Sequence, residues 1–307
     1  MTDAKPPVLV HPPLPMFQPM MSAYEPLNWP TDRKDITAIV GVGSNGVEKD
    51  ILDALPNLKS IVCFGVGIEG FDLSDLAARN ITLTNCAGFN HDDVADFAMG
   101  LVIAVARRFS HAPAIIASGA WSVPVQVPPQ KRLRGKRMGI VGLGAIGAAV
   151  ATRAEAFGLE IAWYGPRAKP EARWRYEPDL KALARWADFL VVCAPGGPET
   201  HHLVDAEVIA ALGADGVLVN IARGSLVDED ALIEALKAER LGGAGLDVYE
   251  EEPTPPAKWA DVPNIYLTPH LAGTTRESLV DAVTNVLENL RRHFADEPLL
   301  TPVRAKK

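Results

Sequence analysis

Short runs of apolar, β-branched residues alternate with stretches of helical pattern along the first hundred residues. Strands are predicted at 36–40, 60–64 and 81–84, with helices between them at 49–55 and 73–78. Strands that alternate with helices pair in parallel, because each crossover helix returns the chain to the same edge of the sheet. This part of the chain therefore predicts an α/β domain whose parallel sheet is covered by helices.

A helix that is apolar nearly all round follows these elements. It is predicted over residues 94–109, with Asp92 or Asp93 as its N-cap. Because its sequence (VADFAMGLVIAVA) has almost no polar face, the helix is expected to be buried between two bodies. A proline-rich loop at 121–130 follows it.

From Met138 the alternation of strands and helices resumes. Six strands with crossover helices are what a doubly wound dinucleotide-binding sheet needs. The predicted strands are 138–141, 160–164, 189–193, 217–221, 245–248 and 265–268, and the predicted helices are 145–157, 205–212 and 229–237. A last helix, predicted over 276–294, is long enough to carry the chain back to the first domain.

Composition narrows the partners and the setting. A chain of 307 residues has room for two domains, and its net charge of −8 disfavours nucleic acid and membrane as partners. Its three cysteines, Cys63, Cys86 and Cys193, are scattered and lack metal-ligand spacing, so we expect no metal site. The first residues lack the pattern of a signal peptide, and we expect a cytoplasmic protein.

A glycine loop follows the predicted strand 138–141 directly and opens the helix 145–157. In a GxGxxG loop the first glycine permits a tight turn, the second lets the backbone approach a pyrophosphate, and the third allows close helix–strand packing. The helix N-terminus offers N–H groups and partial positive charge to the phosphates. The residues expected to bind a dinucleotide here are Gly142, Leu143, Gly144, Ala145, Ile146 and Gly147.

The end of the next strand bears on the choice between NAD and NADP. An acidic residue there would bind the ribose 2′-hydroxyl of NAD. This chain instead reads Gly165-Pro166-Arg167 after the strand, with Lys169 nearby. Because a guanidinium suits a 2′-phosphate, we expect Pro166 and Arg167 to border the cofactor and NADP(H) to be preferred, with NAD(H) possible.

Three polar motifs lie at or just past the ends of later strands, where open α/β sheets bind ligands. They are residues 220–224, 245–253 and 267–273. A keto-acid reductase needs a cation for the carboxylate, a proton donor for the carbonyl oxygen and an acid that orients the donor. Arg223, His270 and Glu252 supply one of each, which predicts a catalytic trio.

The chain resembles the D-isomer-specific 2-hydroxyacid dehydrogenase family over nearly its whole length, and within it the glyoxylate/hydroxypyruvate reductase branch. Besides the glycine loop and the polar motifs, the similarity covers residues 64–67 (FGVG), 85–90 (NCAGFN) and 94–96 (VAD). Two positions depart from the family pattern: Asp96, where the family commonly has Glu, and Ala272, where it often has glycine.

The resemblance implies roles for particular residues. Arg223, Glu252 and His270 would be catalytic, with Arg223 and His270 also contacting the substrate. Backbone N–H groups of Val66 and Gly67 would bind the substrate carboxylate. The further residues implied to contact the cofactor are Pro195, Thr200, Ile221, Ala222, Arg223, Asp247 (through the nicotinamide carboxamide), His270, Ala272 and Gly273.

The resemblance also implies the domain organisation. A discontinuous flavodoxin-like substrate domain would comprise residues 1–102 and 281–307, and a Rossmann dinucleotide-binding domain residues 103–280, with the active site in the cleft between two doubly wound parallel-sheet domains. A homodimer would form through the dinucleotide-binding domain, and the arm 111–130, which carries Trp121, would embrace the partner.

We therefore expect an NADPH-preferring reductase of small 2-keto acids, with glyoxylate and hydroxypyruvate as first choices. A reductase for a bulkier 2-keto acid and a dinucleotide-sensing corepressor of the same fold remain alternatives. Formate dehydrogenases of this superfamily carry Gln where this chain has Glu252, which disfavours that reaction.

Overall fold

The computed structural model describes residues 4–109, 111–119, 121 and 130–303 of the chain. It divides into two compact units, Met1–Asn90 with Arg276–Lys307, and His91–Thr275. The boundaries expected from the sequence, 102/103 and 280/281, lie inside two helices, α3 (His91–Ala106) and α10 (Arg276–Phe294).

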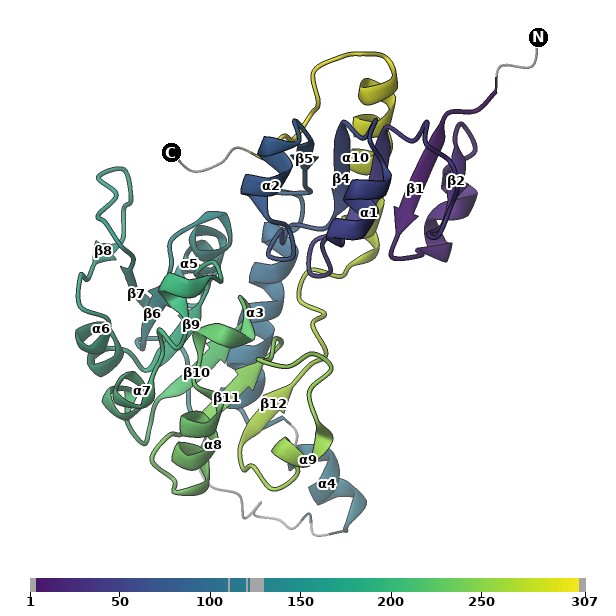
Figure 1. Ribbon diagram of the computed structural model, residues 1–307. Coiled ribbons are helices and arrows are strands. Elements are labelled where there is room, and N and C mark those ends of the chain that lie inside the picture. The colour runs from purple at the N-terminus through teal and green to yellow at the C-terminus, as the bar shows by residue number, and fades with distance from the viewer. Residues whose placement is uncertain (1–3, 110, 120, 122–129, 304–307) are drawn as a thin grey trace. The chain divides into compact units, whose positions relative to one another are not determined.

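The first unit is a parallel sheet of five strands in the order β2-β1-β3-β4-β5. This is the flavodoxin-like order, as the sequence predicted. Its strands are β1 (Pro7–His11), β2 (Glu25–Leu27), β3 (Ala38–Val42), β4 (Ser60–Phe64) and β5 (Thr82–Thr84), and its helical elements are η1 (Pro15–Met20), α1 (Lys49–Ala54), α2 (Leu73–Ala78) and α10. Helix α10 and η1 pack on one face of the sheet, and α1 and α2 on the other (Figure 1).

The second unit is a seven-stranded parallel sheet in the order β12-β11-β10-β9-β6-β7-β8. Numbered within the unit, this is 7-6-5-4-1-2-3, the Rossmann order with one strand added. Its strands are β6 (Arg137–Val141), β7 (Glu160–Tyr164), β8 (Arg175–Tyr176), β9 (Phe189–Val192), β10 (Val217–Asn220), β11 (Gly243–Leu246) and β12 (Ile265–Leu267). The fold therefore confirms two doubly wound parallel-sheet domains.

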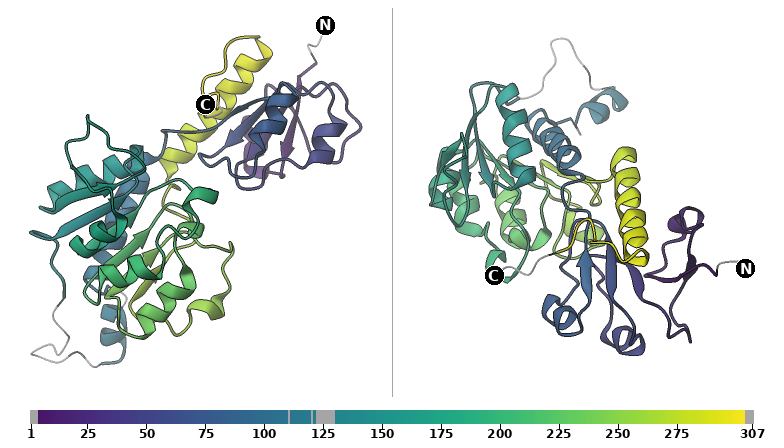
Figure 2. Two further views of the ribbon diagram at one scale, coloured as in Figure 1. Left: turned by 60° about the vertical axis from the view of Figure 1, so that its left-hand side comes forward. Right: turned by 90° about the horizontal axis from the view of Figure 1, so that it is seen from above.

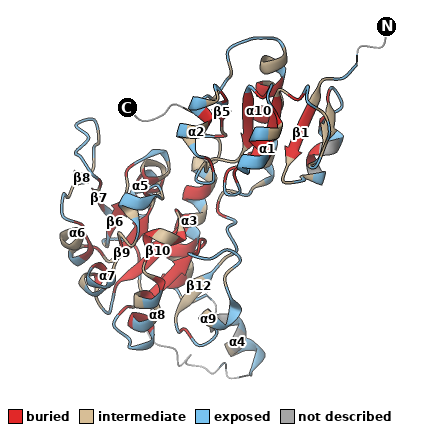
Figure 3. Ribbon diagram, in the orientation of Figure 1, coloured by how far each residue is buried: buried red, intermediate tan, exposed pale blue. Residues whose placement is uncertain are grey.

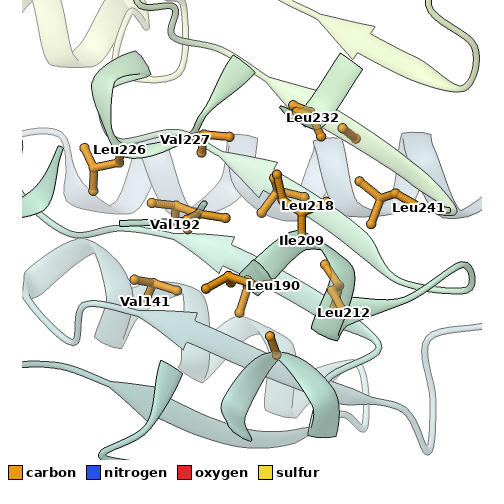
Figure 4. Close-up of a cluster of buried hydrophobic side chains, with 14 of the residues drawn as sticks. Val141, Leu190, Val192, Ile209, Leu212, Leu218, Leu226, Val227, Leu232 and Leu241 are labelled. Carbon is orange, nitrogen blue, oxygen red and sulfur yellow. The ribbon is translucent and has the colours of Figure 1, made fainter. Parts of the chain in front are cut away.

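Helices cover both faces of this second sheet. Helices α3 and α5 (Ala145–Ala156) lie on one face, and α6 (Leu180–Trp186), α7 (Ala206–Leu212) and α8 (Glu229–Lys237) on the other (Figure 2). The short elements of the unit are α4 (His111–Ala117), α9 (Pro256–Trp259), η2 (Pro198–Thr200) and η3 (Gly224–Leu226). Figure 4 shows the core under α7 and α8, where Ile209 and Leu232 pack against Leu190 and Leu218 of the sheet.

The central strands of both sheets are buried on both faces (Figure 3). Burial on both faces is the reason that they appear in the sequence as continuous apolar runs and not as alternating ones. Among the described residues, no helix has the length and apolar character needed to cross a membrane.

Several element boundaries differ from the prediction. Helix α3 begins at His91 and ends at Ala106, so Asp92 and Asp93 lie inside its first turn and neither is the N-cap. Asp92 and Asp96 instead pair with Arg153 of α5, at 3.0 Å and 2.5 Å. Acids near the start of α3 thus hold this helix to α5.

Strand β11 occupies Gly243–Leu246, and its predicted position, 245–248, was two residues late. In the sequence, the glycines of this strand suggest a turn and not a strand. In the structure, a Cβ on Gly243 would lie 2.7 Å from Cγ1 of Val105, and one on Gly245 3.2 Å from Cβ of Leu101. Glycine is therefore required because α3 lies directly against this strand.

The predicted dimerisation arm, 111–130, lies largely outside the described residues. Its described parts are α4, residues 118–119, Trp121 and Gln130. Phe109, Ile116 and Trp121 are large apolar side chains that are more than half exposed.

Candidate active site

The glycine loop lies between β6 and α5, beside the point where the strand order reverses between β6 and β9. Gly142 has φ +96°, and a Cβ there would lie 2.7 Å from Cα of Ala194 in the loop after β9. A Cβ on Gly147 would lie 2.1 Å from the carbonyl oxygen of Gly142. The first and third glycines are therefore required by close approach of backbone to backbone.

The second glycine faces open space. Gly144 is the N-cap of α5, provides no side-chain cap, and has no described atom within 4 Å of a Cβ built on it. The N-terminus of the helix thus has a glycine surface where a phosphate group can approach its N–H groups. Ala145 is exposed here, while Leu143 is buried and Ile146 partly buried. The residues present fit a dinucleotide pyrophosphate.

Cationic side chains lie beyond the end of β7, where the sequence has no acid. Pro166 and Arg167 are exposed. Lys169 Nζ donates a hydrogen bond of 2.6 Å to the carbonyl oxygen of Leu143, so it is held against the glycine loop. Two cationic side chains therefore lie beyond the end of this strand, and one of them contacts the glycine loop.

The loop after β9 is closed by its own hydrogen bonds. Thr200 Oγ1 donates to the carbonyl oxygens of Pro195, at 2.9 Å, and Gly197, at 3.1 Å. Pro195 is exposed and follows Ala194, the residue that lies against Gly142 of the glycine loop. These two predicted cofactor-bordering residues therefore belong to one compact turn.

His270 and Glu252 form a hydrogen-bonded pair. His270 Nδ1 lies 2.7 Å from Glu252 Oε2, and the other carboxylate oxygen, Oε1, accepts the backbone N–H of Tyr249 at 3.0 Å. About half of the His270 side chain is exposed. An acid that holds Nδ1 fixes the orientation of the ring and leaves Nε2 as the nitrogen that can meet a ligand.

Asp247 holds the loop that carries His270. It is fully buried, and its carboxylate accepts three hydrogen bonds, from Thr268 Oγ1 at 2.6 Å and from the N–H groups of Leu271 and Ala272 at 2.8 Å. His270 has φ +53°, a left-handed backbone that needs such support in a residue other than glycine. The structure thus gives Asp247 a positioning role; its contact with a nicotinamide carboxamide remains a prediction.

Tyr249 supports the same loop through a hydrogen bond, and it was not among the site residues predicted from the sequence. Its hydroxyl donates to the carbonyl oxygen of Thr268 at 3.0 Å. Burial, with the nearby charge of Asp247, raises the pKa of Tyr249 to about 12, so the hydroxyl stays protonated as a donor. Its position between Asp247 and Glu252 was the available signal.

Arg223 extends from the loop after β10. Asn220 organises this loop: its Nδ2 donates to the carbonyl oxygen of Arg223 at 2.8 Å, and its Oδ1 accepts the N–H of Ala222 at 3.1 Å. Arg223 itself is partly buried, with Cγ 2.9 Å from where a Cβ on Gly196 would lie. Ile221 and Ala222 are buried, so their backbone is what they can offer a cofactor.

The loop that carries Arg223 and the turn that carries Glu252 are in contact through their backbone atoms. A Cβ on Gly224 would lie 1.8 Å from the carbonyl carbon of Tyr249 and 2.2 Å from the nitrogen of Glu250. This close approach fixes the position of the cation relative to the acid–histidine pair. The pair also borders a cavity of about 730 Å³, whose lining includes Trp259 and Leu267.

Val66 and Gly67 lie in the other unit, directly after β4. Nδ2 of Asn85 donates to the carbonyl oxygen of Val66 at 2.7 Å, and a Cβ on Gly43 would lie 1.7 Å from the carbonyl oxygen of Gly67. Cys63 Sγ also donates to the Gly67 carbonyl oxygen at 3.6 Å, and no hydrogen bond from the N–H groups of Val66 and Gly67 is found within the described part of the chain.

The glycine loop, Arg223 and the acid–histidine pair all follow strands of one doubly wound sheet, at its carboxyl edge. This is the arrangement of a dinucleotide-dependent dehydrogenase. Residues 99–272 match the family model of the D-isomer specific 2-hydroxyacid dehydrogenase, NAD binding domain. The chain belongs to the D-isomer specific 2-hydroxyacid dehydrogenase family, as its motifs predicted.

Relatives and solved structures agree with this assignment. The chain is 42% identical over 268 residues to a 2-ketogluconate reductase from Gluconobacter oxydans, covering 87% of this chain and 86% of the relative. It is 43% identical over 270 residues to a hydroxyphenylpyruvate reductase from Plectranthus scutellarioides, covering 88% and 86%. An NADPH-dependent glyoxylate/hydroxypyruvate reductase from Sinorhizobium meliloti, solved with NADP and malonate, superposes with a TM-score of 0.87 at 35% identity, covering 98% of this chain and 97% of that one.

Proposed function

We propose that this protein reduces small 2-keto acids to 2-hydroxy acids, with NADPH preferred over NADH and glyoxylate or hydroxypyruvate as the first candidate substrates. The observation that carries the proposal is the 2.7 Å pair of His270 and Glu252, built on the same sheet as Arg223 and the glycine loop. The Sinorhizobium meliloti reductase, similar over nearly its whole length, supports this choice of substrates and cofactor.

Each residue of the trio has a distinct task. Arg223 binds the carboxylate and polarises the carbonyl oxygen through its guanidinium fork. His270, held at Nδ1 by Glu252, donates a proton from Nε2 to that oxygen, and general acid help of this kind is worth roughly 10²–10⁴ in rate. A bound reduced nicotinamide supplies the hydride chemistry. Val66 and Gly67 would contribute backbone N–H groups to the carboxylate.

The preference for NADPH rests on the end of β7. The absence of an acid after Tyr164, the exposed Arg167, and Lys169 held against the glycine loop all favour a 2′-phosphate. A homodimer that uses Ile116 and Trp121 of the arm, with Phe109 just before it, is also proposed.

The test is an NADPH-oxidation screen with glyoxylate, hydroxypyruvate, pyruvate, phenylpyruvate and 2-ketoisocaproate, repeated with NADH. We expect turnover of glyoxylate or hydroxypyruvate, and faster turnover with NADPH. Binding of NADPH without oxidation by any 2-keto acid would refute the reductase and favour a dinucleotide-sensing protein of the same fold.

A bulkier 2-keto acid is the second candidate substrate. The cavity of about 730 Å³ beside Glu252 and His270 has mostly apolar walls, including Trp259 and Leu267. The Plectranthus relative, a hydroxyphenylpyruvate reductase, supports this alternative. A kcat/KM for phenylpyruvate that exceeds the value for glyoxylate would favour it.

A further inference from the structure

Glu229 is a buried carboxylate outside the predicted trio. It is the first residue of α8 and is 2% exposed. Its Oε2 lies 2.5 Å from Nζ of Lys258, and its Oε1 accepts the backbone N–H of Glu250 at 2.8 Å. A buried charge is costly unless it is paired and hydrogen-bonded, and here both conditions are met.

The low exposure of the Glu229 side chain distinguishes it from an ordinary acid at the start of a helix. Acids in the first turn of a helix usually serve the helix dipole and are solvated. The next residue, Asp230, fits that description, because its side chain is 94% exposed. Glu229 is instead turned inward against the Tyr249–Glu250 peptide.

That peptide connects Glu229 to the catalytic pair. Its N–H donates to Glu229, and its other side lies against Gly224. The preceding N–H, of Tyr249, donates to Glu252 Oε1, while Glu252 Oε2 lies 2.7 Å from His270 Nδ1. The two N–H groups belong to successive peptides that meet at Cα of Tyr249, so a shift of the Tyr249–Glu250 peptide displaces the backbone donor of Glu252.

The side chain of Glu250 ties in further elements. Its Oε1 lies 2.5 Å from His202 Nε2, in the segment after η2, and its Oε2 lies 3.8 Å from Nζ of Lys258. Nδ1 of His202 in turn lies 4.0 Å from Oδ2 of Asp228, the N-cap of α8.

Lys258, on α9, remains charged at the centre of this cluster. Burial opposes its charge, but the pairing with Glu229 and the carboxylates of Glu250 and Asp230 outweigh it, so the pKa of Lys258 is raised. The ammonium is thus the cationic partner of the buried Glu229 carboxylate.

We propose that Glu229, paired with Lys258, is a positioning residue for the reduction: it orients the Tyr249–Glu250 peptide and thereby sets Glu252 against His270. The inference rests on the proposed function of the trio. It differs from a purely structural role because it predicts an effect on proton donation by His270.

The experiment compares Glu229→Ala, Glu229→Gln and the control Glu234→Ala, an exposed acid on the same helix. Glu229→Ala should lower kcat for 2-keto acid reduction by roughly 10- to 100-fold, the range expected when catalytic groups are misplaced by about an ångström. It should also leave KM for the 2-keto acid and NADPH binding nearly unchanged, so that the loss falls on kcat. Glu229→Gln keeps an oxygen acceptor for the Glu250 N–H and should restore most of kcat, and Glu234→Ala should behave as wild type.

Two results would overturn the proposal. One is a Glu229→Ala enzyme that loses thermal stability only, with kcat and KM at wild-type values per folded enzyme. The other is a Glu229→Gln enzyme as impaired as Glu229→Ala. Should Glu229→Ala fail to fold, Lys258→Met carries the test, with a lower kcat at nearly unchanged KM expected, and a wild-type kcat counting against the proposal. Wild-type turnover is measured alongside, so failure of the proposed function is distinguished from failure of this role.

Discussion

Replacing Gly224 by alanine is expected to push the Arg223 loop away from the Glu252 turn without changing any side chain of the catalytic trio. Gly224 follows Arg223 directly, and the added Cβ would lie 1.8 Å from the carbonyl carbon of Tyr249, 2.0 Å from its oxygen and 2.2 Å from the nitrogen of Glu250. All three obstacles are backbone atoms, so no side chain can rotate away to make room.

The size of the displacement follows from these distances. Ordinary contact with a Cβ begins at 3.4 Å, so the two backbones must move apart by about 1.6 Å, the difference between 3.4 and 1.8 Å. A misplacement of about 1 Å can cost on the order of 10²-fold in rate when reacting groups must be aligned. Overpacking of this kind also destabilises the fold by roughly 1–3 kcal/mol. We therefore expect kcat to fall about 100-fold in a protein that still folds.

The assay is steady-state reduction of glyoxylate with NADPH, together with NADPH binding by fluorescence and a thermal melt. The matched control is Gly100→Ala in α3, an exposed helical glycine with no described atom within 4 Å of the new Cβ. The control should retain wild-type kcat, and NADPH binding should persist in both variants because the glycine loop is unchanged. A folded Gly224→Ala enzyme with wild-type kcat and KM would refute the reasoning.

Three further predictions concern other groups. Arg167→Ala should reduce kcat/KM with NADPH roughly ten- to a hundredfold more than with NADH, since a charge-assisted contact to phosphate contributes about 1.5–3 kcal/mol; equal losses would assign Arg167 another task. Glu252→Gln removes the carboxylate that holds Nδ1 of His270 and should lower kcat, while His270→Ala should remove most of the rate, roughly 10²–10⁴-fold, with NADPH binding retained; a Glu252→Gln enzyme with wild-type kcat would contradict the pairing. Burial, and secondarily Lys59, lowers the pKa of His293 below 6.5, so the unfolded chain takes up this proton first as the pH falls, and stability is lost on acidification below about pH 6.5; denaturant melts of His293→Gln between pH 5 and 7.5 should show a flatter dependence, and an identical slope would count against this group.

Element positions were predictable where burial produces a pattern. The helices α8 and α10 have the predicted bounds because their apolar residues follow the helical period, and β4 has them because burial on both faces makes it a continuous apolar run. The strands β1 and β2 were not predicted: β1 is a short run with prolines on either side, and β2 is three partly buried residues. Short strands of this kind, β1 inside the sheet and β2 at its edge, leave too little periodic signal.

The chemistry of the candidate site was also present in the sequence. The glycine loop, Arg223, Glu252 and His270 could be identified because each is a residue type with a specific task at the end of a predicted strand. The absence of an acid after β7 was likewise readable without coordinates. The sequence by itself thus determined the fold class, the family and the residues that carry the reaction.

Only the tertiary structure decided how those residues are held. In the sequence Glu229 and Asp230 are two adjacent acids at a helix start, yet one is buried under the Tyr249–Glu250 peptide and the other is solvated. The same holds for Asp247, whose carboxylate is engaged by Thr268, Leu271 and Ala272. Such roles depend on which backbone segment folds over a side chain, and that follows from the packing of elements far apart in the chain, not from local pattern.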